Sequence, residues 1–276
     1  KIGISDSSYS AIKSGTYNGD VDKQMKKVIE YFETKRAAAE IYVGTDYKET
    51  SISSNVYKII RNCQLQGGLA IACGDAGIGK TQACRQYYRE HGTNCTYITV
   101  NPCIKSSKSV LELIGSKLNV SSGSVSRLWL EISSKLSDGM VIIVDEAQHL
   151  TRNAIDTLRS LCDCFDEKGQ TLGICFVGNE TTVSRLGGKQ KAEFAQIRNR
   201  TKNTRFYSVK QIKKSDIEML FPDIREDVAA VEFLLRIAQS PQAIRGAVNL
   251  YSNALDNGNV TAKGLSAIAK YMDMAV

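Results

Sequence analysis

The chain has 276 residues, 42% of them hydrophobic and 24% charged, and its 36 Lys and Arg against 29 Asp and Glu give a net charge of +7. This balance is ordinary for a globular protein with a large core, and no apolar run is long enough to span a membrane, so we expect no membrane partner. None of the eight cysteines lies in a C-x-x-C pair, which disfavours a zinc site or a disulfide framework and favours reduced thiols in the cytoplasm.

Residues 1–40 are predicted to form a small helical domain. Asp6 is the expected N-cap of a first helix that Gly15 ends, and Asp20 is the expected cap of a second. The spacing of apolar residues from Ile4 to Gly15 resembles the helix-turn-helix of repressors. Its exposed positions carry few side chains that could bind phosphate or hydrogen-bond to guanine. DNA contact and protein docking therefore both stay possible roles of this domain. These positions are Asp6, Ser7, Ser8 and Ala11.

A polar linker over residues 41–54 leads into a region, residues 55–208, in which strand and helix patterns alternate. Short apolar runs predict five strands, and helical periodicities lie between them. This alternation predicts an α/β fold with a doubly wound parallel sheet. The expected strands are residues 69–73, 96–100, 140–144, 172–177 and 204–208.

A complete G-x-x-x-x-G-K-[ST] motif lies between the first predicted strand and a predicted helix over residues 80–88. Such a loop turns its backbone N–H groups inward around phosphate, and the helix N-terminus adds the positive end of its dipole. Lys80 is expected to reach the β- and γ-phosphates, and Thr81 to hold Mg²⁺. The motif predicts nucleotide binding. Its residues are Gly74, Asp75, Ala76, Gly77, Ile78, Gly79, Lys80 and Thr81.

Two carboxylates follow the predicted strand at residues 140–144. Five apolar residues in a row suit a strand that is buried on both faces, and ligands bind at the carboxyl ends of such strands. Asp145 is expected to hold Mg²⁺ and Glu146 to polarise the attacking water. The alternative is an acidic helix cap after a core strand. Beside the phosphate-binding loop, the pair of acids favours hydrolysis over nucleotide storage.

Positive charge is concentrated in residues 185–214, where ten Lys and Arg face one acid, Glu193. Such a stretch is the electrostatic footprint of a surface for nucleic acid, or for phosphate in a neighbouring subunit. A solvated basic surface is the alternative. The remaining residues, 209–276, have no strand pattern and predict three or four amphipathic helices, one beginning near Pro241 and another near Thr261.

Together these motifs resemble the AAA+ ATPases, and within them the Mu B and TnsC-like transposition proteins. The resemblance spans nearly the whole chain. It is carried by the N-terminal helices, the phosphate-binding loop, the run from Asp145 to Leu150, and the run from Gln196 to Arg200. It implies an AAA+ core at residues 55–208 with a C-terminal helical lid at residues 209–276.

The resemblance also implies roles for residues outside the two central motifs. Asn179 matches the sensor-1 position that orients the lytic water, although it could instead cap the next helix. Arg200 best matches a finger that completes the neighbouring subunit's site, with Arg198 and Arg205 as alternatives and DNA binding as another role. Arg245 matches the sensor-2 arginine of the lid, although it could be a surface residue.

In TnsC-like proteins the DNA surface corresponds to residues 101–137 of this chain. Backbone N–H groups and small hydroxyls at helix N-termini bind phosphate without reading sequence. Lys105, Lys108 and Ser124 match most strongly, whereas Trp129 is expected in the core. The full expected set is Lys105, Ser106, Lys108, Ser121, Ser124 and Arg127.

These expectations favour an ATP- and Mg²⁺-dependent ATPase that binds duplex DNA without sequence preference. It would assemble on that DNA as a helical filament or ring and deliver it to, or activate, a transposase. Two alternatives share the ATPase motifs: a replication initiator or helicase loader of the AAA+ class, and a signalling or secretion ATPase that does not bind DNA.

Overall fold

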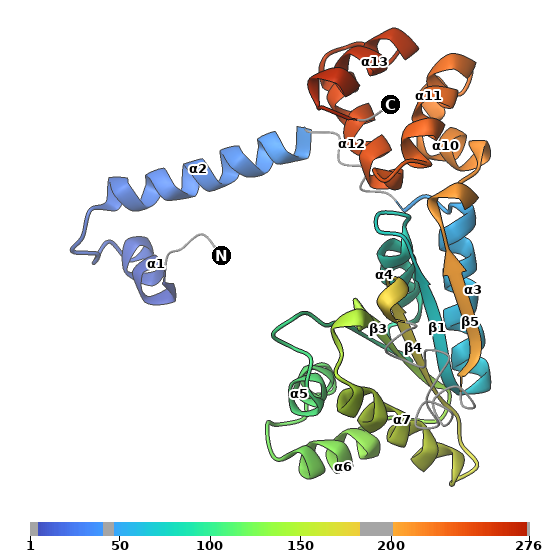
Figure 1. Cartoon of the computed structure of the whole chain (residues 1–276). Coiled ribbons are helices and arrows are strands. Elements are labelled where there is room, and N and C mark those ends of the chain that lie inside the picture. Colours follow the sequence, from blue (N-terminus) through green and yellow to red (C-terminus); the bar gives the residue numbers. More distant parts are fainter. Residues whose placement is uncertain (1–4, 41–46, 183–200, 275–276) are drawn as a thin grey trace.

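The computed structural model describes residues 5–40, 47–182 and 201–274. Its centre is a parallel sheet with the strand order β2-β3-β4-β1-β5 (Figure 1). The fold is therefore the predicted α/β class with a doubly wound parallel sheet. The strands are β1 (Gly68–Gly74), β2 (Cys95–Thr99), β3 (Met140–Asp145), β4 (Leu172–Gly178) and β5 (Thr201–Tyr207).

Helices cover both faces of the sheet because successive side chains of a strand point to opposite sides. In β1, Ala70 and Ala72 face a core shared with α3 and α4, whereas Leu69 and Ile71 face a second core under α5, α6 and α7. The helices are α3 (Ser51–Gln66), α4 (Lys80–His91), α5 (Ser107–Lys117), α6 (Val125–Lys135) and α7 (Arg152–Asp166).

Trp129 packs partly buried against the second core, as expected, and its indole Nε1 donates to Ser160 Oγ at 2.9 Å. Cys73 and Cys175, which lie in the apolar runs of β1 and β4, are fully buried. Both faces of the central strands are therefore closed to solvent. A ligand would have to bind at the carboxyl end of the sheet.

The C-terminal region is helical, and it packs onto the first core. Buried residues of these helices, such as Phe221 and Tyr251, join the cluster that also holds α3 and α4. Two of the helices begin where the sequence predicted, one at Ala243 and one at Ala262, the latter capped by Thr261. The helices are α10 (Lys214–Leu220), α11 (Val228–Ala238), α12 (Ala243–Asp256) and α13 (Ala262–Tyr271).

A buried carboxylate joins this C-terminal region to α3. Asp216 Oδ1 accepts hydrogen bonds from the backbone N–H of Ser51 at 2.6 Å and from its hydroxyl at 2.7 Å, and Oδ2 accepts from Lys213 N. The acid thus lies at the N-termini of both α3 and α10, where negative charge is stabilised. The helix α3 begins at Ser51, inside the segment expected to be a linker.

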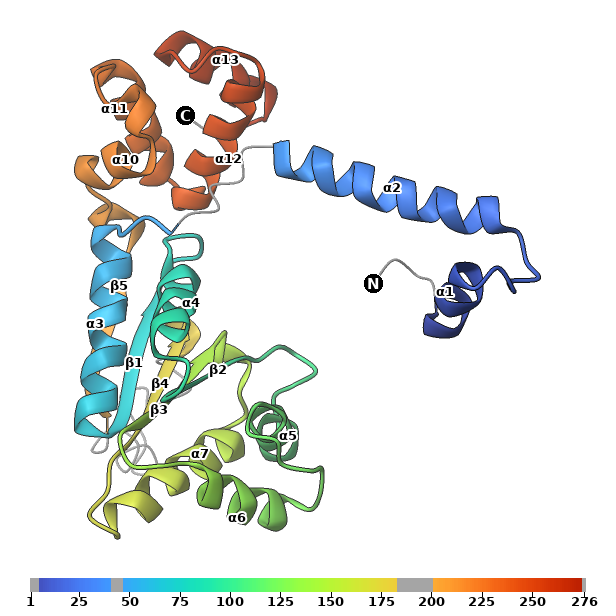
Figure 2. The same cartoon turned by 180° about the vertical axis from the view of Figure 1, so that it is seen from behind.

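Two N-terminal helices, α1 (Asp6–Lys13) and α2 (Val21–Glu40), stand apart from the sheet in both views (Figures 1 and 2). The predicted first cap is wrong by one residue: Ser5 has extended backbone and its side chain accepts from Ser8 N, while Asp6 is already helical. The second cap is as predicted, since Asp20 Oδ1 accepts from Lys23 N. The apolar side chains of Val21, Met25 and Phe32 on α2 are exposed.

No helix within the described ranges is long and apolar enough to cross a membrane.

Candidate functional site

The phosphate-binding loop connects the carboxyl end of β1 to the first turn of α4, as the motif requires. Gly79 has a left-handed backbone with φ 98°, which glycine adopts at no steric cost. At Gly74 a side chain is excluded by space, because an added Cβ would lie 2.0 Å from the carbonyl oxygen of Tyr207. The close approach of β5 to β1 therefore fixes the start of the loop.

The ammonium group of Lys80 lies within the loop itself. It donates to the carbonyl oxygen of Gly74 at 2.9 Å and to that of Asp75 at 2.5 Å. Burial lowers the pKa of Lys80, while the nearby carboxylates of Asp145 and Glu146 act in the opposite direction. A partly desolvated cation with only carbonyl partners is a strong site for phosphate oxygen.

Asp145 ends β3 with its carboxylate buried at 2% exposure. Its Oδ1 accepts from Glu146 N at 2.9 Å, and its Oδ2 accepts from the hydroxyl of Tyr97 at 3.0 Å. Burial raises the pKa of Asp145, and a hydrogen bond from the Thr81 hydroxyl opposes that rise. A buried carboxylate beside a hydroxyl is a set of hard oxygen donors, so these residues fit Mg²⁺.

Tyr97 was not identified from the sequence. It lies on β2, whose register places Thr99 beside Asp145. Burial, together with the charge of Asp145, raises the pKa of Tyr97 to about 12. The phenol therefore stays protonated and acts as a donor to the carboxylate. Nothing in the alternation of residues 95–99 distinguishes this tyrosine from a core residue.

Glu146 follows Asp145 directly and has a left-handed backbone, φ 57° and ψ 33°, which is uncommon for a residue with a side chain. It leads into a 3₁₀ turn, η1 (Ala147–His149), in which the side-chain amide of Gln148 donates to Glu146 Oε2. Asn179 lies at the end of β4 and its Oδ1 accepts from the backbone and hydroxyl of Thr181. In this conformation Asn179 caps the following turn, the alternative that the sequence left open.

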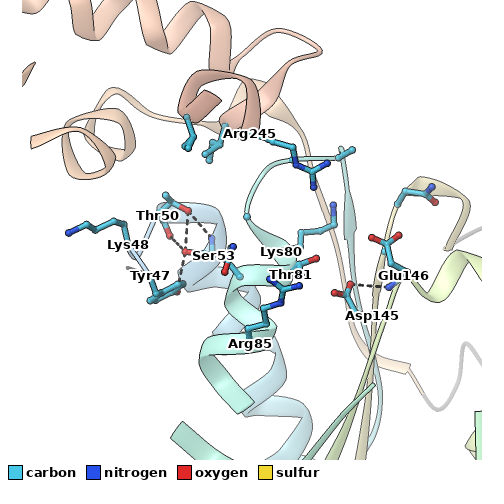
Figure 3. A pocket seen from close by; sticks show the side chains of 18 of the residues that line it. Tyr47, Lys48, Thr50, Ser53, Lys80, Thr81, Arg85, Asp145, Glu146 and Arg245 are labelled. Carbon is cyan, nitrogen blue, oxygen red and sulfur yellow. Dashed lines mark hydrogen bonds between the residues drawn. The ribbon is translucent and has the colours of Figure 1, made fainter. Parts of the chain in front are cut away.

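The C-terminal helices, expected to form the lid, border the site at the top of Figure 3. Arg245 donates its backbone N–H to the carbonyl oxygen of Gly77 at 3.1 Å, and its side chain reaches down toward the loop. The residue two positions earlier, Ala243, has φ 54° and turns the chain into α12. The backbone of Arg245 is thus held against the phosphate-binding loop, and its sensor-2 role stays a prediction.

These groups line one cavity of about 800 Å³. One end holds Lys80, Thr81 and the acids of β3, and the other end is walled by residues that the sequence did not single out (Figure 3). That wall combines the start of α3 and the residues before it with the C-terminal helices, and its mixed apolar and hydroxyl lining suits a purine and ribose. Its members are Tyr47, Lys48, Thr50, Ser53, Leu220, Ile244 and Val248; Arg85 of α4 also lines the cavity.

The predicted trans-acting arginine, Arg200, and its alternative Arg198 lie outside the described residues. The other alternative, Arg205, lies on β5 and lines a separate hollow of about 490 Å³ between β5 and α3. Lys58 and Lys213 line the same hollow. Arg205 is therefore part of a basic surface at one edge of the sheet.

The predicted DNA-binding residues gather at the starts of α5 and α6. Ser106 and Ser124 are the N-caps of the two helices, and each side chain accepts from a backbone N–H of its own helix. Lys105 is exposed, whereas Lys108 lies 3.9 Å from Glu112. In the remaining part of the set, Ser121 is exposed and Arg127 donates to Glu131 at 2.6 Å, an ion pair that raises its pKa.

Comparison with known proteins places this site in a family. The family model described as "AAA domain" matches residues 63–186, the region that contains the loop, Asp145 and Asn179. The chain contains an AAA domain. Its sheet, phosphate-binding loop and helical C-terminal region agree with that assignment.

Over most of its length the chain is similar to B proteins of transposing phages. It is 28% identical over 270 residues to "ATP-dependent target DNA activator B" of Escherichia phage Mu, covering 95% of this chain and 82% of that protein. It is 28% identical over 263 residues to "Mu-like prophage FluMu DNA transposition protein B" of Haemophilus influenzae, covering 91% of this chain and 88% of that protein. The AAA+ and Mu B resemblance is thereby confirmed.

The fold is also similar to a solved ORC2 protein of Aeropyrum pernix bound to ADPNP and ADP. The TM-score is 0.58 at 12% identity, with 79% of this chain and 66% of that chain covered. At this identity the likeness speaks for the fold alone.

Proposed function

We propose that this protein is an ATPase that binds duplex DNA without sequence preference, assembles on it and presents it to a transposase. The observation that carries the proposal is the cavity that gathers Lys80, Thr81, Asp145 and Glu146 beneath the lid residue Arg245. Similarity along 95% of the chain to an ATP-dependent target DNA activator supports the role in transposition.

The cavity has the parts that phosphoryl transfer to water requires. ATP would place its phosphates against the inward N–H groups of the loop, and Lys80 would exchange its carbonyl partners for phosphate oxygen. Thr81 and Asp145 would hold Mg²⁺, which neutralises charge on the phosphates when it is bound. Glu146 would accept a proton from the attacking water, and Arg245 would contact phosphate from the lid.

Nucleotide would control assembly through a residue supplied in trans. Arg200 of a neighbouring subunit is proposed to contact the γ-phosphate, so that subunits associate only around ATP. Assembly would align the N-termini of α5 and α6 from many subunits along one duplex. Many weak phosphate contacts on one scaffold bind strongly through avidity, and hydrolysis would release them.

The proposal is tested by measuring ATP binding, hydrolysis and DNA retention together for wild type and Lys80→Ala. Unrelated duplexes of equal length are used, with ATP, a non-hydrolysable analogue or no nucleotide. We expect ATP-dependent binding to every duplex by wild type, and loss of both ATP and DNA binding by Lys80→Ala. Lys270→Ala, an exposed lysine on α13, is the matched control.

Normal ATP-dependent DNA retention by Lys80→Ala would contradict the coupling. Electron microscopy of the analogue-bound complex tests assembly: a helical filament on DNA supports the proposal. A closed ring that binds a replicative helicase and no transposase would instead assign the replication role.

A further inference from the structure

The side chain of Gln148 bridges Glu146 and Asn179, the two residues expected to act on the attacking water. Its amide nitrogen donates to Glu146 Oε2, and its amide oxygen accepts from the backbone N–H of Asn179 at 3.3 Å. A side-chain amide offers a donor and an acceptor at the same end. The carboxylate after β3 is therefore connected, through one side chain, to the loop after β4.

The bridge depends on a space beside Gly178. A Cβ added at Gly178 would lie 2.4 Å from Gln148 Oε1 and 2.3 Å from Thr182 Oγ1, far inside contact distance. The backbone of this glycine is not left-handed, so the reason for glycine here is space. The end of β4 thus leaves a slot that Gln148 and Thr182 share.

The hydroxyl oxygen of Thr182 lies in this slot. Its side chain is fully buried, and its hydroxyl oxygen has no hydrogen-bond partner among the residues that the structure describes. A buried hydroxyl without a partner is costly. This hydroxyl and the amide oxygen of Gln148 lie beside the same glycine, Gly178. The slot therefore brings two polar side chains together at the end of β4.

We propose that Gln148 is a positioning residue that ties the orientation of the Glu146 carboxylate to the state of the Asn179 loop. While Asn179 caps its own turn, Gln148 holds Glu146 by one oxygen. When nucleotide engages Asn179, the loop moves the Gln148 amide and with it the carboxylate, which leaves Glu146 aimed at the water. Gln148 itself touches no reacting atom. The inference rests on the proposed role of Glu146 in hydrolysis.

The test compares steady-state hydrolysis by wild type, Gln148→Ala and Gln148→Glu, with ATP affinity measured separately by a fluorescent analogue. Loss of an orienting partner typically costs about 10- to 100-fold in activity. We therefore expect the kcat of Gln148→Ala to fall at least about tenfold, with KM and ATP affinity unchanged. Gln170→Ala, an exposed amide in the turn before β4, is the control and should match wild type.

The pH profile distinguishes orientation from packing. The new carboxyl in Gln148→Glu can donate a hydrogen bond to Glu146 only when it is protonated, and when ionised it repels Glu146. The activity of this variant relative to wild type should therefore rise as pH falls, whereas that of Gln148→Ala should not. A parallel profile for both variants, or an unchanged kcat for Gln148→Ala, would overturn the inference.

A double-mutant cycle separates this inference from the proposed function. In a Glu146→Gln background, Gln148→Ala should have no further effect on the residual rate, because the two residues act through one carboxylate. If Glu146→Gln itself hydrolyses ATP at the wild-type rate, the proposed role of Glu146 fails. If Glu146→Gln is inactive but Gln148→Ala is unaffected, the inference about Gln148 alone fails.

Discussion

At the scale of single residues, the site contains an acid, Asp145, and a base, Lys80, whose surroundings disfavour the charged form of each. Asp145 is buried and its pKa is raised, whereas Lys80 is half-buried and its pKa is lowered. Burial disfavours the charged form of each group, yet each must be charged to hold its ligand. Such environments are typical of a site that binds a charged ligand.

Replacing Asp145 by Asn should stabilise the nucleotide-free protein. A carboxyl whose folded-state pKa is raised binds more protons in the folded state than in the unfolded state. Its burial therefore costs stability as pH rises from the unfolded pKa through the folded one, and the full cost applies above both. Removal of that cost should raise Tm at neutral pH, at about 2–4 °C for each kcal/mol removed.

This Tm change is measured by thermal unfolding at neutral pH and again near pH 3, where the difference between Asp145→Asn and wild type should shrink. The same variant should lose ATP hydrolysis, because an amide is a poor ligand for the metal. A lower Tm for Asp145→Asn at neutral pH would show that the hydrogen bonds from Tyr97 and Glu146 outweigh the burial of charge.

Replacing Glu146 by Gln should leave ATP binding intact and slow hydrolysis by about 10²- to 10⁴-fold, the usual contribution of a general base. Lys80, Thr81 and Asp145 keep their places, so nucleotide is still held. DNA complexes formed with ATP should then dissociate more slowly. The measurements are ATP turnover and the lifetime of complexes after challenge with competitor DNA; turnover at the wild-type rate would exclude Glu146 as the base.

At the scale of elements, the two candidate DNA surfaces lie on different parts of the sheet domain. The helices α5 and α6 pack on one face of the sheet, whereas the described part of the basic segment is on the edge strand β5 and the residues that follow it. The stretch from residue 101 to residue 137 carries five Lys and Arg against two acids. Because Lys108 and Arg127 pair with neighbouring acids, Lys105 is the better placed cation.

Replacing Lys105 and Lys108 together by Ala should weaken binding to all duplexes alike and reduce the salt slope by about one unit per lost phosphate contact. The matched control removes Lys117 and Lys135, exposed lysines in the last turns of α5 and α6, and should have a smaller effect. Affinity is measured across a range of salt concentrations.

The competing surface is tested with Lys189 and Lys191 replaced in parallel; both lie outside the described residues. If only that pair weakens binding, the DNA surface belongs to residues 185–214 and the assignment to α5 and α6 is wrong. ATP binding by each variant serves as the check on folding.

At the scale of the whole molecule, the nucleotide cavity lies between regions that are distant in sequence. Tyr47 and Arg245 line the same cavity, and Asp216 ties the start of α3 to the start of α10. A movement of α10 would therefore shift the N-terminus of α3, the helix that follows Tyr47. Assembly adds a second subunit to this arrangement.

A mixture of two inactive variants should regain activity. Arg200→Ala should bind ATP but neither assemble nor hydrolyse it, whereas Lys80→Ala should not bind ATP. In a mixed assembly, an intact loop in one subunit can meet an intact arginine from the other, so hydrolysis should return in proportion to such interfaces. ATPase assays across mixing ratios check this, and no rescue at any ratio, with both variants folded, would point to Arg198 or Arg205 or to no trans arginine.

The sequence by itself determined the sheet and the central motifs, because these depend on local pattern. Runs of apolar residues specify buried strands, and the loop from Gly74 to Thr81 needs only its own glycines and a helix after it. Asp145 and Glu146 could be assigned because they follow a strand whose burial is visible in the sequence. The sequence did not settle the local boundaries: at the cap of α1, Ser5 and Asp6 are both good caps and only the backbone at Ser5 is extended, and α3 begins inside the predicted linker.

Only the tertiary structure decided which remote side chains meet. The purine-side wall needs Tyr47 and the lid to converge, the donor to Asp145 comes from the neighbouring strand at Tyr97, and Gln148 reaches Asn179 through a slot at Gly178. No local pattern encodes these contacts, because each depends on strand order and on the rotamer that a side chain adopts after the chain has folded.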